Sequence, residues 1–192
     1  MLKDLILKNR SYRRFQQERS VPVQTLRELV ELARFSPSAA NLQPLKFLLV
    51  CSPEACARVF PTLAWAGYLQ DWDGPAEGER PSAYIVILGD TRIRAHIDCD
   101  HGIAAQSIML GAVERGLGGC MIGSVDRERL RQELDIPAHF EILLVLALGE
   151  PVEKVVLDDV EPGGDIRYWR DAFGVHHVPK RPLDELIAGE FC

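Results

Sequence analysis

The amino-acid sequence predicts a single domain that mixes helices with buried β-strands. Three short, mainly apolar runs at residues 47–51, 83–90 and 142–149 have the length of buried strands. Segments with apolar residues at helical spacing lie between these runs. A chain of 192 residues with 47% apolar content can build one sizeable core. We therefore expect one domain over residues 1–192, without internal repeats.

Helices are expected at five places along the chain. Apolar residues at positions 2, 5 and 6 predict a short helix over residues 2–8. Pro22 suits the first turn of a helix that runs to about residue 35, because its missing N–H costs nothing there. The remaining helices are expected from residue 53 to about 68, with Pro61 as a candidate break, from 101 to about 115, and from Asp126 to about 134.

Three segments have the composition of connections or extended chain. Residues 70–82 are rich in Gly, Pro and charge, which favours a surface excursion or a lid that carries Trp72. Residues 116–124 contain four glycines, which either end a helix before a short strand or let the backbone approach a flat ligand. Residues 150–192 read as an extended arm with aromatic anchors, a type of segment that often wraps a partner subunit.

Composition excludes several classes of function. The net charge of −6 and the lack of a basic run argue against nucleic acid as a partner. No stretch approaches the roughly 20 apolar residues of a membrane span, and the N-terminus does not resemble a signal peptide. The five cysteines lack paired CxxC spacing, so we expect reduced thiols in a cytoplasmic protein rather than a disulfide framework or a zinc site.

Two polar clusters are candidate binding sites. The loop from Pro37 to Pro44 offers the side chains of Ser38, Asn41 and Gln43 at close range, which suits either a capped turn or a polar, planar ligand. Residues 10–14 hold three arginines and a serine, which suit either an oxyanion or a solvated basic patch.

The sequence offers no side-chain machinery for catalysis. It contains neither a GxSxG elbow nor an HExxH helix, and its carboxylates are scattered. The adjacent His176 and His177 would point to opposite faces of a strand, which makes a poor metal clamp. Arginines for a phosphate, amides for a ring and glycines for close approach instead indicate an enzyme whose chemistry is carried by a bound cofactor.

Four motifs in order carry a resemblance to a known family. They are Arg10-Ser11-x-Arg13-x-Phe15, the segment from Ala33 to Pro44, the segment from Gly116 to Gly123, and Leu148-Gly149-Glu150-Pro151. With these motifs the chain resembles, over nearly its whole length, the nitroreductase family of FMN-dependent oxidoreductases.

The resemblance implies a fold and an activity. The fold would be α+β, with a mainly antiparallel central sheet flanked by helices, in an intertwined homodimer with FMN at the interface. NADH or NADPH would give hydride to flavin N5, and a small acceptor such as a nitroaromatic or a quinone would then be reduced in a ping-pong scheme. Two alternatives are another task of the same fold, such as flavin fragmentation or reductive dehalogenation, and a non-catalytic module that stores FMN.

The resemblance also assigns residues to the cofactor site. For the phosphate and ribityl chain these are Arg10, Ser11 and Arg13, with Lys180 or Arg181 reaching the phosphate from the C-terminal arm. For the flavin ring they are Pro37, Ser38, Ala39 and Asn41 of the other protomer, and Ile122, Gly123 and Ser124 at the redox edge. Gln43 also matches the motif, in a cofactor or a structural role.

The resemblance also bears on the substrate pocket. Residues 60–82, with Trp65, Tyr68 and Trp72, would shape this pocket, and Cys120 would be a packing residue near the flavin. The chain departs from the family pattern at Leu45, where Trp is common, and at Asn9, where Arg or Lys is common.

Overall fold

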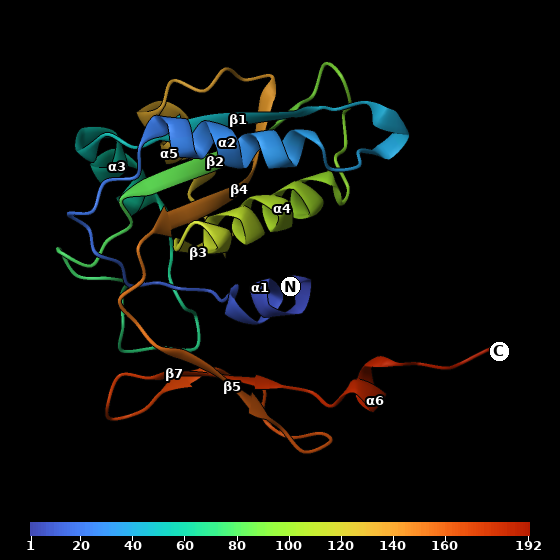
Figure 1. The fold of residues 1–192 in the computed structure, drawn as a ribbon. Coiled ribbons are helices and arrows are strands. Elements are labelled where there is room, and N and C mark those ends of the chain that lie inside the picture. The colour runs from blue at the N-terminus through green and yellow to red at the C-terminus, as the bar shows by residue number, and fades with distance from the viewer.

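A four-stranded antiparallel sheet forms the centre of the molecule. The computed structural model describes all of residues 1–192, and its main sheet has the strand order β1-β2-β4-β3 (Figure 1). The four strands are β1 (Leu45–Val50), β2 (Ala83–Asp90), β3 (Gly118–Ile122) and β4 (Phe140–Gly149). Every residue of β2 is buried, because this strand pairs with β1 and β4 and has helices over both of its faces.

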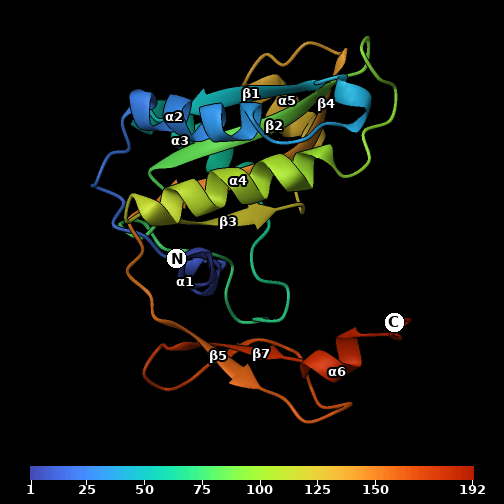
Figure 2. The same cartoon turned by 45° about the vertical axis from the view of Figure 1, so that its right-hand side comes forward.

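Helices cover the two faces of this sheet and build two core clusters. On one face, α2 (Val23–Arg34) and α4 (Asp100–Glu114) run side by side, as Figure 2 shows. Gly111 of α4 permits this close packing, since a Cβ there would lie only 2.2 Å from Cδ1 of Leu32. The other face is covered by α3 (Pro53–Val59), the 3-10 turn η2 (Phe60–Thr62) and α5 (Arg127–Glu133). No helix of the structure is both long and apolar enough to cross a membrane.

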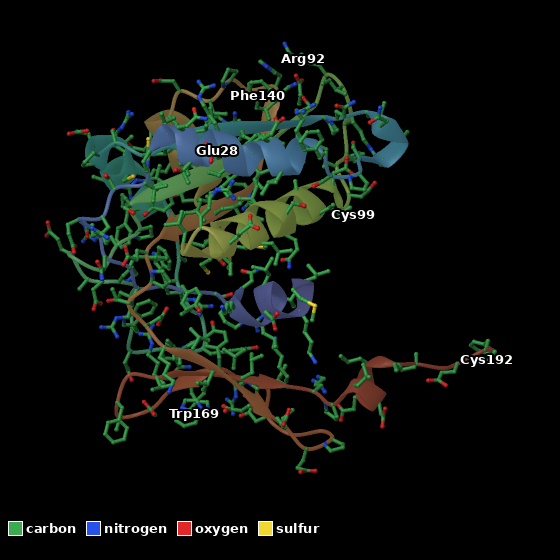
Figure 3. All side chains as sticks on the ribbon, in the orientation of Figure 1. Glu28, Arg92, Cys99, Phe140, Trp169 and Cys192 are labelled. Carbon is green, nitrogen blue, oxygen red and sulfur yellow. The ribbon has the colours of Figure 1, made fainter.

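The C-terminal arm, residues 150–192, forms a small sheet of its own. Its strands are β5 (Val155–Asp159), β6 (Trp169–Arg170) and β7 (His176–Lys180), and the short helix α6 (Leu183–Leu186) follows them. The central strand β7 pairs parallel with β5 and antiparallel with β6. In Figure 3, where Trp169 marks this arm and Glu28 marks α2, α1 (Leu2–Lys8) lies between the arm and the main sheet, and Tyr168 of the arm packs against the core cluster on one face of that sheet.

Most expected elements are present, and the α+β fold with an antiparallel central sheet is confirmed. The helix expected from residue 53 to about 68 is wrong in its second half. Here α3 ends at Val59 and η2 holds Pro61, whose ring cannot continue a helix, so residues 63–68 form no helix. Gly116 ends α4 with a φ of +75° before the short strand β3, which is the helix-stop alternative for this glycine-rich segment.

Candidate functional site

The N-terminal segment lies against β3 and brings its arginines to that edge of the sheet. Ser11 forms a parallel bridge with Gly119, and the backbone N–H of Tyr12 donates to the Gly119 carbonyl over 2.9 Å. The close approach of β3 to β4 needs a glycine, because a Cβ on Gly119 would lie 2.3 Å from the Ala147 carbonyl oxygen. In this extended segment Ser11 and Arg13 share one face.

A cavity of about 340 Å³ lies between this segment, α4, β3 and the arm, and we call it the arginine cavity. Its polar lining includes Arg10, Ser11 and Arg13 from the N-terminal segment and His176 and Lys180 from β7. Nε of Arg10 is buried there without a hydrogen-bond partner, and Lys180 forms no ion pair. The cavity therefore brings three cations together, at least two of them with unused donors, which is the environment that a phosphate prefers.

Arg13 is held in place by the arm. Its Nη1 lies 3.2 Å from Nε2 of His176, and its guanidinium lies 4.9 Å from the centre of the Tyr168 ring. Burial and the nearby guanidinium of Arg13 lower the pKa of His176 to about 4, so the imidazole is neutral at physiological pH. A neutral Nε2 accepts the hydrogen bond from Arg13, which leaves the proton on Nδ1, a buried atom without a partner.

A buried carboxylate supports the backbone at the same point. Glu153 accepts a hydrogen bond from the backbone N–H of Arg13 and forms an ion pair with Arg170 at 3.0 Å. The guanidinium of Arg170 lies 4.2 Å from the ring centre of Trp72. Residues from the N-terminal segment, the 60–82 excursion and the arm therefore meet in one network beneath the cavity.

A second cavity of about 220 Å³ opens at the C-terminal end of β3, and we call it the β3 cavity. It is lined by residues 64–67 and by residues 120–124, which include Ile122, Gly123 and Ser124. The backbone N–H groups of Gly123 and Ser124 donate to no other group of the protein. Two consecutive unpaired donors can stabilise negative charge that develops on a ligand beside them.

The two cavities adjoin, because Arg13, Met121 and Tyr168 line both of them. Together they offer a cationic end and an end with free backbone donors. Cys120 lines the β3 cavity but is 5% exposed, and burial raises the pKa of its thiol, which fits the expected packing role.

The loop from Pro37 to Pro44 lies elsewhere. The hydroxyl of Ser38 donates to the buried carboxylate of Asp100 over 2.7 Å and accepts from the backbone N–H of Gln43 over 3.0 Å. Ala39 also donates its backbone N–H to Asp100, at 3.2 Å. This bonding pattern is that of a capped turn, one of the two alternatives for the loop.

The same loop holds three non-glycine residues in the left-handed region. The φ angles are +50° at Ala40, +54° at Asn41 and +50° at Gln43. Such conformations cost energy, and they persist where the surroundings impose them. Asn41 is exposed, and its side chain forms no hydrogen bond within the chain.

One chain does not bring this loop to the two cavities at β3. Pro37, Ser38 and Gln43 line a separate cavity of about 610 Å³ between α2 and β1, which shares no residue with the arginine cavity or the β3 cavity. In Figure 1 the turn η1 (Ala39–Asn41) projects beyond the end of the sheet, away from the arm. The residues assigned to the cofactor site thus fall into two separate groups.

The two basic residues at the end of β7 have different surroundings. Lys180 lines the arginine cavity, whereas Arg181 forms an exposed ion pair with Glu185 at 3.2 Å. Lys180 is therefore the better placed of the two for a ligand in the cavity.

Sequence reasoning did not select most of the residues that line the arginine cavity, among them Gln106, Met121, Tyr168 and His176. Tyr168 and His176 stand more than 150 positions from Arg13 in the chain, and a parallel pairing of short polar strands gives little periodic signal. The aromatic content of the arm is the available hint, and it indicates a contact with a partner subunit equally well.

Part of the 60–82 excursion is fixed rather than free. Glu79 pairs with Arg14, and Oε1 of Gln17 accepts from the backbone N–H groups of Gly78 and Arg80. The residues of the excursion that line the β3 cavity are 64–67, and Tyr68 packs against Tyr168 with ring centres 4.9 Å apart.

Comparisons with known proteins bear on the family and the fold of this chain. The profile described as Nitroreductase family matches residues 6–150. A protein named NADH dehydrogenase from Thermus thermophilus is 29% identical, over 88% of this chain and 95% of its own length.

Two solved structures show the same fold. An FMN-dependent nitroreductase from Clostridium difficile superposes with a TM-score of 0.64 at 24% identity, covering 77% of this chain and 87% of that one. A nitroreductase-like protein from Streptococcus mutans gives a TM-score of 0.65 at 19% identity, covering 80% of this chain and 91% of that one.

Proposed function

This chain belongs to the nitroreductase family, and we propose that it is an FMN-dependent NAD(P)H oxidoreductase that reduces small electron acceptors such as nitroaromatics and quinones. One observation carries the proposal: a cavity with three cations adjoins a cavity with two unpaired backbone N–H groups. FMN combines a phosphate with a ring that becomes negatively charged on reduction, so it needs both environments. The Thermus relative is named for NADH and the Clostridium protein for its FMN dependence, which supports the nicotinamide and the flavin, respectively.

The residues present fit this cofactor. Arg10, Arg13 and Lys180 would hold the phosphate, and Ser11 would contact the phosphate or the ribityl chain. The unpaired Nε of Arg10 is a donor that a phosphate oxygen would satisfy. Ile122, Gly123 and Ser124 would lie at the redox edge of the ring.

Bound FMN would supply the two-electron chemistry, taking hydride from a nicotinamide at N5 and passing electrons to the acceptor. The protein's own residues would bind the cofactor and orient it. Arg13 is locked by Tyr168 and His176, so its charge is placed before the ligand arrives. The backbone donors of Gly123 and Ser124 would stabilise negative charge on the ring. No side chain is assigned as a catalytic acid or base.

The proposal includes a homodimer. Pro37, Ser38, Ala39 and Asn41 lie away from the cavities of their own chain, so a second copy would supply them to the ring. Gln43 is bonded within its own loop, through the hydroxyl of Ser38 and the carbonyl of Asn41. Gln43 therefore holds the shape of the loop, which fits the structural role left open for it.

The first test is the absorbance spectrum of the purified protein, followed by denaturation and identification of the released chromophore. We expect stoichiometric FMN, bleaching by NADH or NADPH under anaerobic conditions, and reoxidation by a quinone or a nitroaromatic. FMN that neither nucleotide reduces would favour another flavin task of this fold. A flavin that turns over no acceptor would favour a storage module.

Variants test the residues and the dimer. Arg13→Ala should weaken FMN binding by about 1.5–3 kcal/mol, because a charge-assisted hydrogen bond to the phosphate is lost. Arg58→Ala, an exposed arginine on α3, is the matched control and should leave the affinity unchanged. Light scattering should give a dimer, and a flavin-loaded monomer would refute the shared site.

A further inference from the structure

A cavity that the proposed function does not use lies at the start of β2. It has a volume of about 190 Å³ and lies between the N-terminal end of β2, helix α3 and residues 17–20. It shares no residue with the arginine cavity or the β3 cavity. We call it the Tyr84 cavity, after the largest fully buried side chain of the protein, which lines it.

Three side chains around this cavity have buried polar atoms without a hydrogen-bond partner: Arg80 (Nε), Ser82 (Oγ) and Tyr84 (hydroxyl). Tyr84 is 0% exposed and Ser82 is 8% exposed, so both side chains lie out of bulk solvent. Buried polar groups in native proteins are almost always paired. Three unpaired groups around one cavity therefore indicate that something polar occupies it.

Each of the three unpaired groups can donate a hydrogen bond. The guanidinium of Arg80 packs 4.4 Å from the centre of the Phe60 ring and pairs with no carboxylate. Burial raises the pKa of Tyr84 far above its usual range, and the charge of Arg80 opposes the shift without cancelling it, so the hydroxyl keeps its proton. Burial raises the pKa of Cys56 to about 11, so this neighbouring thiol is neutral as well.

The rest of the lining is mainly apolar. Pro53, Ala57 and Phe60 contribute hydrocarbon surface, and Glu18 is the one acidic residue of the lining. A cavity of roughly 150 Å³ is large enough for benzene. The occupant that satisfies a cation and two hydroxyl donors while filling the remaining space is a small carboxylate with a compact apolar body.

We propose that Arg80, Ser82 and Tyr84 form a second binding site, for a small aromatic or branched aliphatic carboxylate. The carboxylate pairs with the guanidinium and accepts from the two hydroxyls, and its hydrocarbon part packs between Phe60 and Pro53. The site does not depend on flavin, because none of its residues lines the proposed cofactor cavities. Its failure would therefore leave the proposed function untouched.

The test is titration calorimetry of the purified full-length protein with benzoate, followed by a crystal soaked in benzoate. We expect binding with density between Arg80 and Tyr84, and no change in the visible absorbance of any bound flavin. Benzamide has the same shape without the charge, and it should bind at least tenfold more weakly because the charge-assisted hydrogen bonds are lost.

Variants decide whether the binding belongs to this site. Arg80→Gln should weaken benzoate binding tenfold or more, since it removes the cation. Tyr84→Phe removes only the unpaired hydroxyl and keeps the packing, and it should weaken binding several-fold. Arg58→Gln, an exposed arginine on the neighbouring helix α3, is the matched control and should bind as the parent protein does.

Three results would overturn the proposal. The first is no detectable binding at millimolar benzoate. The second is binding that is unchanged in both Arg80→Gln and Tyr84→Phe, or that shifts the flavin spectrum and so reports the other site. The third is a soaked crystal in which only ordered water contacts the three donors.

Discussion

The stability of the protein should fall on acidification through a single buried histidine. His176 is 1% exposed, lies beside Arg13 and Arg170, and has a pKa lowered from 6.5 to about 4 by burial and by these cations. The unfolded chain therefore takes up a proton below about pH 6.5, whereas the folded chain takes it up only near pH 4. The stability that neutral His176 provides is complete above pH 6.5 and is lost as the pH falls toward 4.

The magnitude follows from the two pKa values. Between about pH 8 and about pH 5 the difference in proton uptake lowers the free energy of unfolding by about 2 kcal/mol. His176→Asn removes the titrating group and keeps a side-chain oxygen that can accept from Arg13, so this part of the pH dependence should disappear.

Urea denaturation at the two pH values, at one protein concentration, measures the effect. The difference between the parent protein and His176→Asn should shrink by about 2 kcal/mol on acidification, because protonation penalises only the parent. The exposed His96 gives the control His96→Asn, which should lose stability on acidification as the parent does. Equal losses in the parent and His176→Asn, or a pKa above 6 measured for His176 by NMR, would refute the reasoning.

Three further predictions concern folding, each measured by urea denaturation. Gly119→Ala should destabilise by about 1–3 kcal/mol, because its Cβ would meet a backbone carbonyl of β4, and an unchanged midpoint would contradict that contact. Asp100→Ala should lower the free energy of unfolding by about 2–3 kcal/mol, because it leaves the donors of Ser38 and Ala39 without an acceptor. The exposed Asp98 gives the control Asp98→Ala, which should change stability little. Asp126→Ala should cost about 1 kcal/mol by removing the cap that accepts from the backbone N–H of Arg129, and its loss should be visible in helical circular dichroism.

The sequence is most informative where apolar runs are continuous. The strand at residues 83–90 is predicted to the residue, because residues 83–88 form an unbroken apolar run that is buried on both faces. The strand at β4 begins at Phe140, two residues earlier than predicted, since Glu141 interrupts the apolar run without ending the pairing with β2. Pairing depends on the backbone, and composition shows it only indirectly.

The arm is the hardest part to predict. Its strands are short and polar, and their pairing joins β5 to a strand about 20 residues away, so no local period marks them. The motifs locate Arg10, Arg13 and the segment around Gly123. Tyr168 and His176 reach the lining of the arginine cavity only through tertiary packing. The proposed meeting of the two groups of assigned residues depends on assembly, so no periodicity within one chain predicts it.

The left-handed residues of the loop at Ala40 have a consequence for engineering. The left-handed conformation of Ala40 costs about 1–2 kcal/mol relative to glycine, a substantial part of the roughly 5–15 kcal/mol that holds a domain folded. Ala40→Gly would relieve this cost and raise the melting temperature, yet it would also free the loop to sample other shapes. A thermostable version of this protein is therefore easy to reach at this position, and the same substitution would show how much rigidity the loop needs.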